Sequence, residues 1–113
     1  MQSYQLYIYL SYNIEIQIGK LGLFTFPKGT YVYTGSAKRN LNQRITKHFL
    51  MDKNLFWHID YLLANEHTKI INVTKSELSE CDLNADLKGK IIVKGFGNSD
   101  CGENCNSHLK FIS

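Results

Sequence analysis

The sequence lacks long apolar runs, internal repeats and low-complexity stretches. No segment approaches the roughly 18 consecutive apolar residues that a membrane helix needs, and residues 1–10 lack the pattern of a signal peptide. No Pro- or Ser-rich stretch indicates a linker or a disordered tail. With 43% apolar and 12% aromatic residues among 113, we therefore expect one soluble, cytoplasmic domain over residues 1–113, which buries about two thirds of its unfolded surface.

Cysteine is scarce, with three residues at Cys81, Cys101 and Cys105. An odd and small number excludes the disulfide framework of a small secreted protein. Together with His108, the three thiols would make a tetrahedral zinc set. Free thiols, buried or reactive, are the stronger alternative, because the Cys-x-x-x-Cys spacing is loose and Cys81 is remote from it.

A large excess of charge is also absent, since the formal net charge is only +3. The chain is therefore not a polycation that would coat nucleic acid at any position. Positive charge is nevertheless gathered in one stretch of eleven residues without an acid: Lys38, Arg39, Arg44, Lys47 and His48. This stretch could neutralise a few phosphates, although a solvated helix face explains it equally well.

The hydrophobic pattern predicts an α+β fold. Period-two alternation or short β-branched and aromatic runs indicate extended segments at residues 4–10, 13–18, 30–33, 70–73, 91–93 and 108–112. Helical spacing indicates three helices, from Asn40 onward, over residues 56–63, and from a Ser76 cap to Gly89. We expect the first two strands to form a hairpin through residues 11–13, within a small antiparallel or partly mixed sheet flanked by helices.

Three side chains around the third strand favour phosphate chemistry. The extended run that contains Tyr33 breaks at Gly35, and a basic helix then presents Arg44 and His48 one turn apart, on the same face. These residues supply a phenol, a permanent cation with a planar donor fork, and a group that titrates near neutrality. A strand, a turn and a solvated helix without chemistry remain the alternative.

Several motifs in order along the chain resemble the GIY-YIG nuclease superfamily, particularly a small stand-alone branch formerly of unknown function. The second motif of that branch, typically Tyr-Val-Gly-Ser-Ala, is matched by Tyr33-Thr34-Gly35-Ser36-Ala37. The other typical stretches are residues 18–22 (Ile-Gly-Lys-Leu-Gly), 57–63 (Trp-His-Ile-Asp-Tyr-Leu-Leu), 95–97 (Gly-Phe-Gly), 99–101 (Ser-Asp-Cys) and 107–109 (Ser-His-Leu). Separated motifs in the right order are more specific than one tripeptide.

The resemblance implies a divalent-metal-dependent endonuclease, acting on DNA in repair or processing. It places the two motif tyrosines on Tyr4 and Tyr33, the helical arginine on Arg44 and its partner histidine on His48. It places the Mg²⁺- or Mn²⁺-binding glutamate on Glu80, with Glu77 as the alternative. Tyr33 is the favoured base, although Tyr4 or His48 fits the same residues.

Two departures from the family pattern favour a rival function. The first motif reads Gln2-Ser3-Tyr4, which keeps the phenol and loses the usual glycine. The asparagine that many relatives carry beyond the glutamate is unmatched, unless Asn98 or Asn106 replaces it. The rival is therefore an inactive nucleic-acid-binding module of the same fold, with or without zinc.

The predicted second helix begins with aromatic residues that could contact nucleic acid. Trp57, His58 and Tyr61, with Phe56, could stack on unpaired bases beside the cut site, although such residues more often form core. We expect Ile59, Leu62 and Leu63 to pack inward and His58 and Asp60 to face outward. Because 113 residues leave no room for a separate specificity domain, target choice would come from single-stranded or branched DNA shape, self-association or a protein partner.

Overall fold

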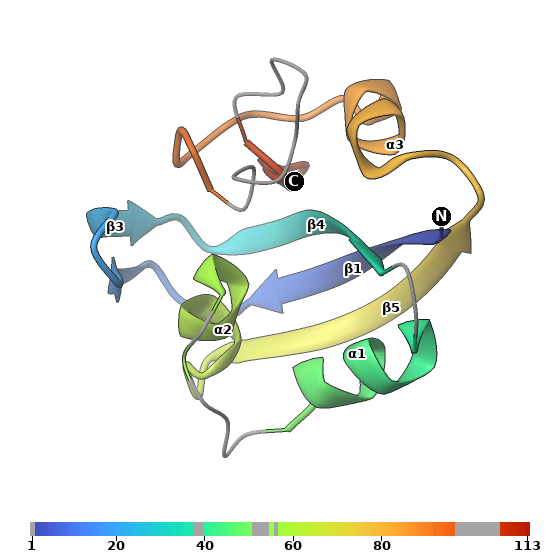
Figure 1. The fold of residues 1–113 in the computed structure, drawn as a ribbon. Coiled ribbons are helices and arrows are strands. Elements are labelled where there is room, and N and C mark those ends of the chain that lie inside the picture. The colour runs from blue at the N-terminus through green and yellow to red at the C-terminus, as the bar shows by residue number, and fades with distance from the viewer. Residues whose placement is uncertain (1, 38–39, 51–54, 56, 97–106) are drawn as a thin grey trace.

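A four-stranded antiparallel sheet, a separate two-stranded hairpin and three short helices make up the fold of the computed structural model (Figure 1). The structure describes residues 2–37, 40–50, 55, 57–96 and 107–113, without the side chains of residues 2, 37, 80 and 81. The elements are β1 Gln2–Leu10, β2 Ile14–Ile18, β3 Gly22–Phe26, β4 Gly29–Ala37, α1 Leu41–His48, α2 His58–Leu63, β5 Thr68–Ser76, α3 Glu80–Asp86 and β6 Leu109–Phe111. The predicted α+β class is confirmed.

The sheet has the order β5-β1-β4-β6, and all of its neighbouring strands are antiparallel, so the mixed alternative is wrong. β1 is a central strand because it pairs with β4 along one edge and with β5 along the other. Leu6 and Ile8 are fully buried on one face, and Ser3 is fully buried on the other. In this register Tyr4 lies opposite Gly35 of β4, and Leu6 lies opposite Tyr33.

The predicted hairpin between the first two strands is wrong. β1 pairs with β4 and β5, whereas β2 pairs with β3 across the Gly19–Gly22 turn. Gly19 has a φ of 48°, a left-handed conformation that glycine adopts without strain. The nine-residue β1 pairs along almost its whole length with β4 on one edge and with β5 on the other, so no edge of β1 is left for the five-residue β2.

The main core lies between the sheet and the first two helices. Tyr4, Leu6, Ile8 and Leu10 alternate onto one face of β1, as the period of a strand requires. α1 buries Leu41, Ile45 and His48 at helical spacing, and α2 buries Ile59, Leu62 and Leu63. Figure 1 shows α1 and α2 on the same side of the molecule, with α3 apart from them beyond β4.

Two later elements differ from their predictions. The cap of α3 is Ser79 rather than Ser76, because β5 extends through Ser76 and the Ser79 hydroxyl accepts a hydrogen bond from the Asp82 N–H at 3.2 Å. Residues 91–93 form no strand, and only an isolated bridge joins Lys90 to Phe111. The expected strand at 108–112 is the short β6, on the outer edge of β4.

None of the described helices combines the length and the apolar character that would let it cross a bilayer.

Candidate active site

A buried tyrosine–histidine pair joins the first strand to the first helix. The Tyr4 hydroxyl and Nε2 of His48 share a hydrogen bond of 2.7 Å, although 44 residues separate them in sequence. Tyr4 is 1% exposed and His48 is 6% exposed. The bond satisfies two buried polar groups and gives a proton a direct path between phenol and imidazole.

Tyr33 completes a compact group of rings on the same face of the sheet. Its ring centre lies 6.4 Å from that of Tyr4 and 6.2 Å from that of His48, and the Tyr4 and His48 rings are 5.6 Å apart. We call Tyr4, Tyr33 and His48 the Tyr–His cluster. Phe96 packs edge-on against Tyr33 at 6.4 Å, a contact for which the Gly-Phe-Gly motif was the only sequence signal.

Gly35 makes the approach of these rings possible. A Cβ atom at Gly35 would lie 2.6 Å from the Tyr4 hydroxyl oxygen and 3.1 Å from Cε2 of Tyr33. The first distance is shorter than any ordinary contact, so a side chain here would displace the Tyr4 ring. The predicted break of the strand at Gly35 is wrong, since β4 continues to Ala37.

A third buried phenol nearby serves structure instead. Tyr31 donates a hydrogen bond to the Pro27 carbonyl at 2.5 Å and packs against Phe26 and Phe111. Burial raises the pKa of the Tyr31 hydroxyl above its usual value. A phenol that holds its proton this firmly is unsuited to act as a base at neutral pH.

Arg44 is held at the end of β4, next to the Tyr–His cluster. Its Nη1 donates to the Ser36 carbonyl at 2.6 Å, and its guanidinium carbon lies 5.5 Å from the ring centre of Trp57. Ser36 directly follows Gly35. The end of β4 against which the Tyr4 ring packs therefore also binds Arg44. Arg44 itself is exposed, unlike the three rings.

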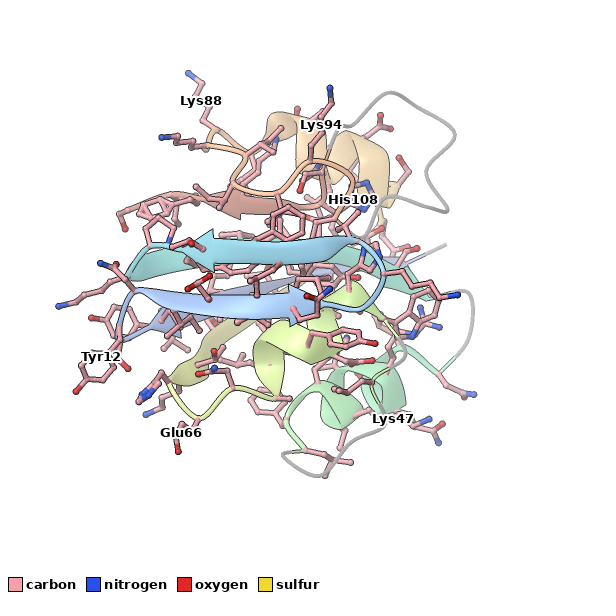
Figure 2. All side chains as sticks on the ribbon, turned by 90° about the vertical axis from the view of Figure 1, so that its left-hand side faces the viewer. Tyr12, Lys47, Glu66, Lys88, Lys94 and His108 are labelled. Carbon is pink, nitrogen blue, oxygen red and sulfur yellow. The ribbon has the colours of Figure 1, made fainter. Side chains whose placement is uncertain are left out.

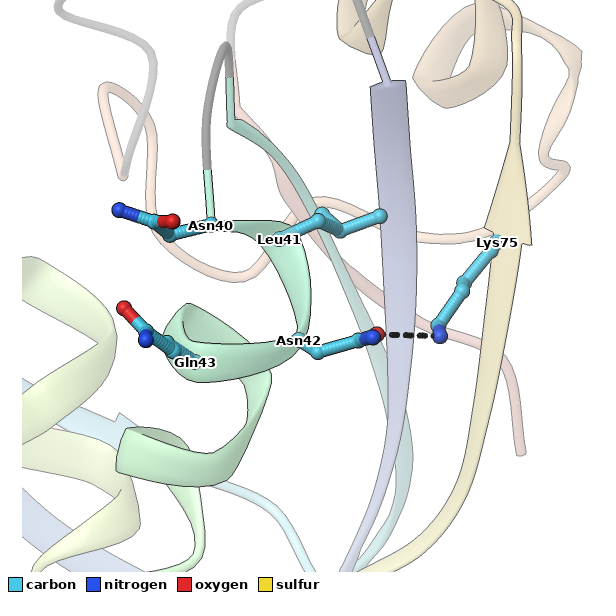
Figure 3. A pocket seen from close by; sticks show the side chains of 5 residues that line it. All are labelled: Asn40, Leu41, Asn42, Gln43 and Lys75. Atoms are coloured by element: carbon cyan, nitrogen blue, oxygen red, sulfur yellow. Dashed lines mark hydrogen bonds between the residues drawn. The ribbon is translucent and has the colours of Figure 1, made fainter.

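Other cations lie farther along α1 and β5. Lys47 extends from α1 into solvent (Figure 2). Lys75 reaches from β5 to α1, where its Nζ donates to the Asn42 side-chain oxygen at 2.5 Å. A polar hollow lies at that place, lined by Asn40, Leu41, Asn42, Gln43 and Lys75 (Figure 3).

Glu80 is the first residue of α3, and its side chain lies outside the described part of the structure. The backbone before it is tied to β1, because the Ser3 hydroxyl donates to the Leu78 carbonyl at 2.7 Å. Ser3 precedes Tyr4 and points to the other face of the strand. The start of α3 therefore reaches the same end of β1 as Tyr4, from the opposite face.

The second helix begins at His58 rather than at residue 56, and neither His58 nor Asp60 faces outward as predicted. Asp60 is 8% exposed rather than outward-facing, because its carboxylate accepts the Trp57 backbone N–H at 2.8 Å and so caps α2. His58 is half-buried against Phe96, with ring centres 5.6 Å apart. Burial lowers the pKa of His58, so its imidazole is neutral at pH 7.

Several predicted ligands fall outside the described part of the structure. They are Lys38, Arg39, Phe56, Asn98, Cys101, Asn106 and Cys105, together with the side chain of Cys81. His108, the remaining member of the predicted zinc set, is fully buried. Among the described residues, no three His, Cys, Asp or Glu side chains gather closely enough to suggest a metal site.

A comparison with protein-family models supplies the family. The model described as Domain of unknown function DUF123 matches residues 3–113. The chain belongs to this family. No curated protein and no solved structure matched the chain. The DUF123 match covers every residue of the Tyr–His cluster and Arg44, while its description states no activity, so the function has to be argued from the site.

Proposed function

We propose that this DUF123 protein is a divalent-metal-dependent endonuclease that hydrolyses phosphodiester bonds in DNA, as the resemblance to the GIY-YIG superfamily implies. The observation that supports it most is the convergence at one strand end. Residues 33–36 of β4 carry Tyr33, leave room for Tyr4 beside Gly35, and hold Arg44 through the Ser36 carbonyl. Phenol, imidazole and guanidinium groups from three elements therefore meet at one place.

Arg44 is suited to receive the phosphate. Hydrolysis adds negative charge to the phosphoryl oxygens, and a positioned cation stabilises that charge more than it stabilises the ground state. A guanidinium carries five N–H donors in a planar fork that matches two phosphate oxygens. Its hydrogen bond to the Ser36 carbonyl keeps this fork beside Gly35, the residue on which the Tyr4 ring packs.

Tyr33 is our candidate for the general base. In the reaction, a water oxygen forms a bond to phosphorus and the bond from phosphorus to the leaving sugar oxygen breaks. The water proton passes to Tyr33, which has to enter the step as the phenolate, and the leaving oxygen takes up a proton from solvent. Tyr33 is 7% exposed, compared with 1% for Tyr4, so it is the more accessible of the two phenols. In this assignment Tyr4 and His48 position the Tyr33 ring and take up charge beside it.

Glu80 is the candidate ligand of Mg²⁺ or Mn²⁺, with Glu77 as the alternative. Such a hard ion takes one or two carboxylates and completes its shell with water and substrate oxygens, so it needs no cluster of protein ligands. When bound, the ion would add positive charge beside the phosphate. The hydrogen bond from Ser3 to Leu78 brings the start of α3 to the end of β1 where Tyr4 lies, on the opposite face of that strand. To serve as the ligand, the carboxylate has to reach past the end of the strand towards Arg44.

The rival function is a DNA-binding module of the same fold without catalysis. The burial of the Tyr–His cluster favours it, because Tyr4, Tyr33 and His48 are each less than a tenth exposed. Substrate would have to reach this cluster from the Arg44 side. The rival and the nuclease differ in their response to the divalent ion.

A cleavage panel tests the proposal. Purified protein is incubated with labelled single-stranded, nicked, flapped and duplex DNA in Mg²⁺, in Mn²⁺ and in EDTA, beside the Glu80→Ala and Glu77→Ala variants. We expect cleavage of at least one DNA in a divalent ion and none in EDTA. Loss of cleavage in Glu80→Ala, with retention in Glu77→Ala, would identify the ligand.

The opposite results contradict the proposal in distinct ways. DNA binding without cleavage in either ion would support the inactive module. Equal cleavage in EDTA would show that the reaction needs no divalent ion. The zinc content of the same preparation tests the predicted zinc set separately. Less than about half an equivalent of zinc per chain would exclude that set.

A further inference from the structure

Trp57 lies beside the arginine of the candidate active site and shares its surface. The Arg44 guanidinium carbon lies 5.5 Å from the centre of the Trp57 ring, while Nη1 bonds to Ser36. A cation over an aromatic face is attracted by the ring's π electrons, which holds the two side chains together. The indole is therefore a neighbour of whatever Arg44 binds.

Contact with the indole leaves the arginine able to bind phosphate. The guanidinium carries five N–H donors in a planar fork, and its attraction to the ring occupies none of them in a conventional hydrogen bond. One of the five donors is used on the Ser36 carbonyl. A phosphate at the edge of Arg44 would thus place its attached nucleotide next to Trp57.

Trp57 is both rigidly held and open to solvent. Its backbone N–H is bound by the buried Asp60 carboxylate, and the next residue begins α2, whose Ile59 and Leu62 lie in the core. The side chain is nevertheless 37% exposed. A fixed, exposed aromatic ring is the kind of surface on which a nucleic-acid base stacks without a large loss of conformational freedom.

We infer that Trp57 stacks on an unpaired base next to the phosphate that Arg44 binds, so that the substrate class is single-stranded DNA or DNA with an unpaired nucleotide at the cut. This inference rests on the proposed function. Bases inside a duplex are covered on both faces by their neighbours, so an indole can stack only on one that is unpaired or at an end. With a net charge of only +3, the chain can neutralise few phosphates. Stacking on a base would supply additional binding energy.

Intrinsic fluorescence tests this directly, because Trp57 is the only tryptophan in the chain. The protein is titrated in EDTA with a single-stranded oligothymidylate, with its blunt-ended duplex, and with an abasic oligomer of equal length and charge. We expect saturable quenching by the single strand and little quenching by the duplex or the abasic oligomer. Equal quenching by all three would overturn the inference.

Matched variants separate stacking from folding. Trp57→Ala should weaken single-strand binding, measured by anisotropy of a labelled oligonucleotide, by about 5- to 150-fold, and Trp57→Phe should restore most of it. Both variants keep the backbone N–H that Asp60 binds. Tyr12→Ala removes an exposed aromatic ring beyond the other end of β1, where it lies edge-on to His67, and should bind as the parent does. Equal affinity of Trp57→Ala and the parent would overturn the inference.

The result is independent of whether the protein cuts DNA. Single-strand quenching without cleavage in Mg²⁺ would support stacking and contradict the proposed hydrolysis. Cleavage of single-stranded and duplex DNA at equal rates, with no quenching, would support hydrolysis and contradict stacking. A change in emission that depends on protein concentration and not on DNA would show that a second copy of the chain binds the surface around Trp57. That result would also contradict the inference.

Discussion

At the scale of single residues, Gly35 decides the geometry of the site. Tyr4 and Gly35 are directly opposite in the β1–β4 register, and the space that a side chain would fill is taken by the Tyr4 ring. The sequence motif marked Gly35 as important. It suggested that the strand ends there, rather than that Gly35 makes room for a ring from the neighbouring strand. Local pattern shows where a glycine lies and cannot show which ring crosses it.

We predict that Gly35→Ala displaces the Tyr4 ring and lowers the free energy of unfolding by about 1–3 kcal/mol, as overpacking does. Urea unfolding measures the change. In a Tyr4→Leu background, where the ring tip is absent, the same substitution should cost little, because the two positions are in contact. Equal costs in both backgrounds would show that Gly35 acts through backbone freedom instead.

The remaining site residues differ in how far sequence could predict them. Spacing alone placed Arg44 and His48 one turn apart on a helix. It could not show that His48 is buried and hydrogen-bonded to the Tyr4 hydroxyl. Nor could it show that Arg44 stays exposed beside the Trp57 ring. Those contacts depend on how the helix packs on the sheet, which is set by residues far away in sequence.

At the scale of elements, period-two patterns found the strands better than their partners. Residues 4–10 and 13–18 fall in β1 and β2, whereas β3 was missed and the hairpin between the first two strands was wrong. Strand pairing depends on how every strand of the sheet fills both of its edges. Segments that are adjacent in sequence are only the commonest partners, so a local pattern cannot identify the pairs. The first two helices lie close to their predicted places, because a buried stripe at helical spacing is a local signal. The third is shorter than predicted, since β5 extends through Ser76.

The contact between α2 and the segment that ends at Phe96 predicts a pH effect on stability. Burial lowers the pKa of His58 in the folded state, so the unfolded chain binds that proton more readily. Stability from His58 is therefore present above the unfolded pKa of about 6.5 and falls as the pH drops through the folded pKa. The sign is a loss of stability on acidification.

We expect the urea midpoint of the parent protein to fall more between pH 7.5 and pH 5 than that of His58→Asn. The difference between the two proteins isolates His58, since His48, His67 and His108 are unchanged in the variant. An identical fall in both would mean that protonation of His58 costs nothing in the folded state.

At the scale of the whole molecule, chemically useful groups gather at one end of the sheet. The N-terminal end of β1, the C-terminal end of β4, α1 and the start of α2 meet there, and the segment before α3 reaches the same end from the other face. Composition showed that the chain is not a polycation, and motifs in order along the chain indicated a resemblance to the GIY-YIG superfamily. The shared location emerges only from the folded chain.

The central claim is that Arg44 and the Tyr–His cluster hydrolyse a phosphodiester bond, and the rate at which a labelled single strand is cleaved in Mg²⁺ tests it most directly. Relative to the parent, Arg44→Ala should be slower by about 10²- to 10³-fold and Tyr33→Phe by about 10²- to 10⁴-fold, with circular dichroism unchanged. Arg44→Lys should recover only part of the rate, because lysine keeps the charge and loses the planar fork. Cleavage by Arg44→Ala and Tyr33→Phe at the parental rate would contradict the claim.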